Sequence, residues 1–188
     1  AAGVAQAVSV APSYQHLTFS GAGIKTPASG TLSIAGNWAV GSATALNTNN
    51  PTVTVTGNVS GASQITMGSG NLTVTGNWSH SAGTTGGAGA VILNGGSPSL
   101  SATTFNHLTI SISGSVAPAG TVVVNGNFTL AGGTLNTNNQ SLTVVGTTSI
   151  SGTLNITGGV GGTITFGNLT INSGGTFDNT AQAEDPII

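Results

Sequence analysis

The carboxylates of this chain are too few and too clustered to predict an enzyme active site. Its 188 residues contain three acids, Asp178, Glu184 and Asp185, so residues 1–177 hold no Asp or Glu. Hydrolysis or elimination of polysaccharides needs paired carboxylates, or a carboxylate with a base, on one surface. No Gly-x-Ser-x-Gly motif occurs, and no histidine has a nearby acid to orient it. We therefore predict that the chain is not an enzyme.

The three histidines, His16, His80 and His107, are the remaining candidate metal ligands. A metal site needs further ligands at short spacing, and the chain has no cysteine. His16 and His107 stand at matching positions of two similar strings, which favours packing along a ladder or at the surface. The glycine-rich run 158–162 lacks the Asp that calcium-binding solenoid repeats carry. We predict no metal and no cofactor.

The chain is almost free of charge, with 2% charged residues and Lys25 as the one Lys or Arg. Phosphate binding needs clustered Lys and Arg, so we predict no nucleic-acid partner. No run of 18 apolar residues occurs, so no membrane insertion is expected. Cytosolic proteins usually keep a charged surface. Together with the small residues of positions 1–7, which are typical of a processed export signal, this indicates an extracellular or cell-surface protein.

Apolar residues alternate with Thr, Ser and Asn along most of the chain, which predicts β-strands rather than helices. Val53 and Val55, for example, alternate with Thr52, Thr54 and Thr56. The same pattern recurs at Leu32 with Ile34, Leu72 with Val74, Leu108 with Ile110, Leu142 with Val144, Leu154 with Ile156, and Ile164 with Phe166. Gly-Asn, Gly-Gly and Ser-Gly pairs between these runs are typical of tight corners.

Two nested repeats predict the architecture. Residues 14–104 return in similar form as residues 105–188, and residues 1–13 precede them as an apolar segment. Within each copy, strand-like runs that end in Gly recur about every twenty residues, the length of one solenoid coil. We predict an all-β, right-handed parallel β-helix (a β-solenoid) with coils of about 20 residues and a duplicated repeat of about 90 residues. A β-sandwich is the alternative.

Several strings resemble the β-strand repeats of bacterial surface and secreted proteins, including large adhesins and autotransporter-like passengers. They are NHLTI, GNLTINSGGTF, GTLNTNN and SLTVVGTTSISGTLNI. The resemblance implies an extracellular, β-helical protein with a structural or adhesive role.

We expect a structural subunit of an extracellular filament or surface layer whose partner is a second copy of itself. Neither end of the chain looks like the polar cap with which solenoids guard their terminal coils. The subunit interface is therefore predicted at both termini. Its candidate residues are Val8, Val10, Pro186, Ile187 and Ile188.

Two alternatives use a side face of the solenoid. An adhesin or glycan-binding module would use Trp38 and Trp78, although their matching repeat positions favour core packing. An ice-binding protein would use the Thr-x-Thr strands, although that pattern is interrupted at Ser33 and Val123. Because few groups titrate near neutrality, stability is predicted to be insensitive to pH between about 4 and 9.

Overall fold

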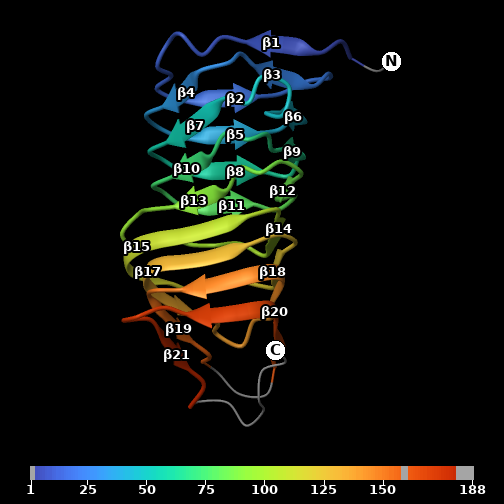
Figure 1. Cartoon of the computed structure of the whole chain (residues 1–188). Coiled ribbons are helices and arrows are strands. Elements are labelled where there is room, and N and C mark those ends of the chain that lie inside the picture. The colour runs from blue at the N-terminus through green and yellow to red at the C-terminus, as the bar shows by residue number, and fades with distance from the viewer. Residues whose placement is uncertain (1–2, 158–160, 181–188) are drawn as a thin grey trace.

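The computed structural model describes residues 3–157 and 161–180, and these form one stack of β-strand coils (Figure 1). Strand pairs such as β4 with β7 and β18 with β20 are parallel, and no helix occurs in the described residues. The coils repeat about every 20 residues over about eight turns. The predicted β-solenoid is thus confirmed, and the β-sandwich alternative is wrong because sandwich sheets are built from antiparallel strands.

Each coil has three sides, which we name faces A, B and C in the order in which the chain visits them. Face A begins with Gln6–Val8 (β1), Lys25–Pro27 (β3), Thr44–Ala45 (β6), Ile65–Thr66 (β9) and Thr84–Thr85 (β12). It continues with Thr103–Phe105 (β14), Val122–Val124 (β16) and the first residues of Leu142–Ile150 (β18) and Ile164–Ile171 (β20).

Face B holds Thr31–Ile34 (β4), Thr52–Val55 (β7), Leu72–Val74 (β10) and Val91–Leu93 (β13), then the first residues of Leu108–Val116 (β15) and Phe128–Asn136 (β17). Face C holds Leu17–Phe19 (β2), Trp38–Val40 (β5), Val59–Gly61 (β8), Trp78–His80 (β11), the last residues of β15 and β17, Thr153–Asn155 (β19) and Thr176–Asp178 (β21).

In the second half of the molecule, single strands bend around a corner. Residues 142–144 of β18 pair with β16 on face A, and residues 148–150 pair with β17 on face B. The sequence shows where this happens, because the inward alternation of Leu142 and Val144 stops at Gly146 and resumes at Thr148.

Alternation of apolar and polar residues fills the interior, since successive side chains of a strand point to opposite sides. The parallel register stacks like positions of successive coils, so each inward position forms a column. On face B one such column is Leu32, Val53, Leu72, Val91, Leu108, Phe128 and Thr148. All of these residues are buried.

The sequence duplication does not place matching residues on the same face. Leu17 pairs with Trp38 on face C, whereas its counterpart Leu108 pairs with Val91 and Phe128 on face B. A repeat of about 90 residues is not a whole number of coils of about 20 residues. The second copy is therefore turned by one face about the solenoid axis, which sequence matching alone could not reveal.

Candidate functional site

The two repeated histidines each start a ladder of side chains that runs along a corner. His16 Nδ1 accepts a hydrogen bond from the backbone N–H of Asn37 at 3.0 Å, one coil later. His107 Nδ1 accepts in the same way from Asn127 at 2.9 Å. The predicted ladder packing of these histidines is confirmed. Because the repeat copies lie on different faces, His16 is at the corner of faces B and C, and His107 is at the corner of faces A and B.

Asparagines extend both ladders. Asn37 Oδ1 accepts from the N–H of Asn58 at 2.9 Å, and Asn58 Oδ1 accepts from Asn77 at 2.8 Å. Asn127 Oδ1 likewise accepts from Thr147 at 3.1 Å. These contacts provide acceptors for backbone N–H groups at the corner, where the pairing between strands is interrupted. The Asn-x-Ser/Thr strings at these sites follow from a corner Asn, an inward apolar residue and an outward hydroxyl.

The glycine before each ladder Asn is required by close packing. A Cβ atom at Gly36 would overlap the carbonyl of Gln15 and the ring of His16, and one at Gly126 would overlap the ring of His107. The Gly-Asn pairs therefore mark corners where one coil lies directly on the side chain of the coil before it.

His80 has a different environment, in the interior of the solenoid. It is fully buried beside Trp78, with ring centroids 5.5 Å apart. Its Nδ1 accepts from the N–H of Gly83 at 3.1 Å, so Nε2 carries the proton and donates to the carbonyl of Ser63 at 2.9 Å. Both ring nitrogens are thus used by the neutral form. Burial lowers the pKa of His80, although the bond with Ser63 opposes this.

The charged side chains do not form a reactive cluster in the described residues. Lys25 is 5% exposed, and its ammonium group bonds to Gln6 Oε1 and to the carbonyl of Ala22. Asp178 Oδ1 accepts from the N–H and the hydroxyl of Thr180, which hold its pKa below the usual value. Glu184 lies outside the described residues, as does Asp185. Within residues 3–157 and 161–180, no three His, Cys, Asp or Glu side chains could share a metal ion.

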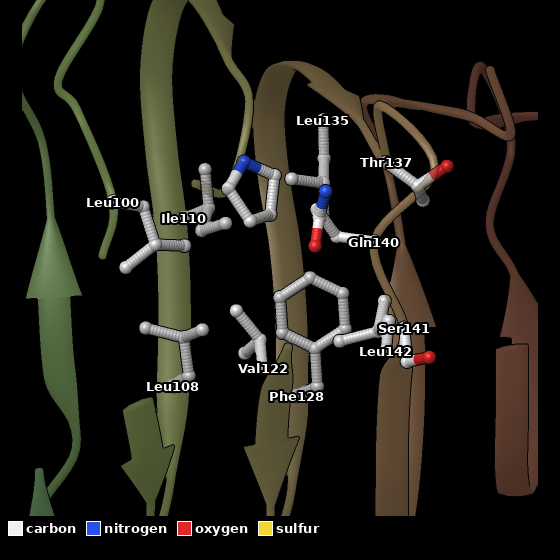
Figure 2. Close-up of a pocket in the computed structure, with 11 residues that line it drawn as sticks. Leu100, Leu108, Ile110, Val122, Phe128, Leu135, Thr137, Gln140, Ser141 and Leu142 are labelled. Carbon is white, nitrogen blue, oxygen red and sulfur yellow. The ribbon is translucent and has the colours of Figure 1, made fainter. Parts of the chain in front are cut away.

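One small cavity lies inside the second half of the solenoid. Figure 2 shows Leu100, Ile110, Val122 and Phe128 around it, with the polar Gln140 at one side. Its volume is about 10 Å³, which is room for about one water molecule and far below the roughly 300 Å³ of a small-molecule site. The cavity is a packing defect of the core.

The large aromatic side chains are core residues. Trp38, Trp78, Phe105 and Phe128 are each 0% exposed. Trp78 packs at 5.2 Å against Phe105, and its Nε1 donates to the carbonyl of His80. The expected core packing is confirmed, and neither tryptophan can serve as an exposed stacking platform for a sugar. A Trp78→Ala substitution would therefore test the core and not a glycan site.

The residues predicted to form the subunit interface are only partly described. Val8 belongs to β1, which pairs with β3 as the first strand of face A, and both Val8 and Val10 pack against the core while remaining partly exposed. Pro186, Ile187 and Ile188 lie outside the described residues. Sequence reasoning missed Ile171, which points inward on face B and is nevertheless 48% exposed. The alternation of Leu169 with Ile171 is the signal that could have found it.

Hydroxyl groups line the outside of face B more regularly than the sequence indicated. Thr54 pairs with Ser33 on one side and with Thr73 on the other, so their side chains stack outward. Ser33 therefore continues the column, and Val123 lies on face A, where it pairs with Thr104 and Thr143. Val123 does not interrupt the array on face B, because the second repeat is turned by one face, and Ser33 contributes a hydroxyl group although it is not part of a Thr-x-Thr string.

No helix of the described residues is long and apolar enough to cross a membrane. Comparisons of the chain with protein-family models, with curated proteins and with solved structures find no match.

Proposed function

We propose that this protein is a non-catalytic structural subunit of an extracellular filament or surface layer, and that its copies stack end to end. The observation that carries the proposal is an exposed inward-facing residue in the last coil of the described residues. Ile171 stands at the end of an inward column that contains Leu130 and Ile150, yet 48% of its surface is exposed. Phe177 on face C also packs only partly against the core.

The strands of the terminal coils also offer free edges within the described residues. β1 pairs with β3 only, and at the other end β20 pairs with β18 only. An unpaired edge carries a row of N–H and C=O groups that another strand can bond. A parallel stack has the same repeat at both ends, so the first coil of one copy can continue the last coil of another.

Side-chain chemistry supports the same contact. Stacked head to tail in register, a second copy would bring its Tyr14 over Ile171 on face B, because Tyr14 pairs with Ile34 and so begins the column that ends at Ile171. Tyr14 and Leu17 are partly buried apolar residues that pack against the first coils. Joining unlike ends in this way makes a heterologous contact, which builds an open filament rather than a closed ring.

The charge distribution does not oppose association. Lys25 is buried, and Asp178 is the one acid of the described residues. Copies of such a chain repel one another little. This lowers the solubility of a free monomer, but it does not oppose the assembly of a polymer. The same composition supports export to the cell surface, as does the lack of any cysteine that could need a reducing compartment.

The test is the molecular mass of the protein in solution, measured by analytical ultracentrifugation over a range of concentrations. We expect the wild type to form large particles and Ile171→Lys to stay monomeric, because a lysine at this position puts a charge into the stacked core. Val145→Lys is the matched control, because Val145 is 63% exposed at a side corner of β18, one coil before the end, where it does not belong to an inward column. Wild-type protein that stays monomeric at high concentration, or equal effects of the two variants, would contradict the proposal.

A further inference from the structure

A column of hydroxyl groups runs along the outside of face B. The parallel register places the middle residue of each face B strand over that of the coil before it. The column contains Ser33, Thr54, Thr73, Ile92, Thr109, Thr129, Ser149 and Thr170. Ile92 alone lacks a hydroxyl, and it is β-branched like threonine.

A second polar column lies two residues further along the same strands. It contains Thr56, Thr75, Asn94, Ser111, Ser151 and Asn172, and it is interrupted at Ala35 and Ala131. The strand register extends to it, because the N–H groups of Thr56, Thr75 and Asn94 bond to the carbonyls of Ile34, Val55 and Val74 in the preceding coil. Thr75 Oγ1 also donates to Asn94 Oδ1 across the coils at 3.0 Å.

The two columns form a two-dimensional array of hydroxyl and amide groups on the outside of face B. Neighbouring coils are about 4.8 Å apart, and positions two residues apart along a strand are roughly 6.6 Å apart. Threonine is stiff at χ1, so its hydroxyl and methyl groups are held in place by the sheet. These two repeat distances are comparable with the repeats of water oxygens on the surfaces of hexagonal ice.

The face is also uncharged. Lys25 belongs to face A and Asp178 to face C, so no ionised side chain belongs to the strands of face B. Charged groups hold water in tight shells that do not fit a crystal of ice, whereas hydroxyl and methyl groups accept an ordered water layer. With no exposed aromatic ring among these columns, the face lacks the usual means of stacking on a sugar.

We propose that face B binds ice, with the outward column from Ser33 to Thr170 as the contact surface. The inference is independent of end-to-end association, because the face lies on the side of the solenoid and not at its ends. The second polar column extends this surface, and the backbone register sets the spacing of both columns.

The experiment measures thermal hysteresis and inhibition of ice recrystallisation. Thr109→Lys places a charged, flexible chain in the middle of the array and should abolish most of the activity. Ser79→Lys makes the same change on face C, where Ser79 is exposed on β11, and should leave the activity as in the wild type. An inactive wild type, or equal losses in the two variants, would overturn the proposal.

Two further measurements separate the causes of a loss. Circular dichroism shows whether each variant keeps its β signal. If Thr109→Lys unfolds, Thr54→Lys takes its place and should likewise lose most of the ice activity. Ile171→Lys changes an inward position of face B and none of its outward hydroxyl groups, so it should keep ice activity whether or not it assembles. Binding of the wild type to crystalline cellulose or chitin without any effect on ice would also overturn the proposal, because the face would then recognise a polysaccharide.

Discussion

At the scale of single residues, His80 makes stability depend on pH. Its folded-state pKa is lowered by burial, whereas the unfolded chain has an ordinary value near 6.5. The unfolded state therefore binds more protons as the pH falls through this range, and folding loses the stability that His80 contributes above it. The sequence predicts that stability is insensitive to pH between about 4 and 9, and with His80 buried we expect this only above about pH 6.5.

We expect the melting temperature to be constant above about pH 7 and to fall as the pH is lowered from 6.5 towards 5. The groups that contact the His80 ring, from Ser63, Trp78 and Gly83, do not ionise in this range. His80→Gln, which cannot titrate, should lower the melting temperature at pH 8 and flatten its pH dependence. Equal slopes for the wild type and this variant below pH 6.5 would show that another group is responsible.

Thr148 is a polar residue in an apolar column. It is fully buried between the strands of Phe128 and Leu169, and its hydroxyl finds no partner in the described residues. A buried hydroxyl without a hydrogen bond costs about 1–3 kcal/mol. Thr148→Val should therefore raise the free energy of unfolding in urea by about 1 kcal/mol. Thr143→Val, on the outside of the same strand, should change it little, and a destabilised Thr148→Val would contradict this account.

At the scale of elements, the corner ladders hold neighbouring coils in register. His107 contributes an acceptor for the N–H of Asn127, and asparagine does the same at later positions of both ladders. His107→Asn should therefore leave stability nearly unchanged, whereas His107→Ala should lower the free energy of unfolding by about 1 kcal/mol. Chemical denaturation measures both. If Asn were as damaging as Ala, or if Zn²⁺ stabilised the wild type alone, the histidine would have a role beyond the ladder.

The strands could be predicted because inward apolar residues repeat at every second position, as at Val53 and Val55. The burial of His80 could also have been predicted, since it stands two residues after the buried Trp78 on the same strand. The face that each repeat occupies could not be read from matching strings. The corner of faces B and C and the corner of faces A and B carry the same Gly-Asn and His contacts, so local similarity between His16 and His107 does not fix their place around the axis.

At the scale of the whole molecule, Gln6–Val8 (β1) forms the first strand of face A. β1 bonds to β3, and Gln6 contacts the ammonium group of Lys25. Each coil of a solenoid depends mainly on its neighbours, so a chain that lacks residues 1–13 should keep its β signal in circular dichroism. It should fail to form large particles, because β1 is removed together with Val8 and Val10, and the face A part of the stacking surface is lost. Unfolding of the truncated chain would show that this first strand is essential to the core, and normal assembly would place the contact elsewhere.

Electron microscopy of the purified protein at rising concentration tests the central claim most directly. The account predicts unbranched filaments one solenoid wide, with a repeat of about 4.8 Å along the filament axis because the coil stack continues across each junction. Dispersed compact monomers at the highest concentration, or particles that lack this axial repeat, would contradict it.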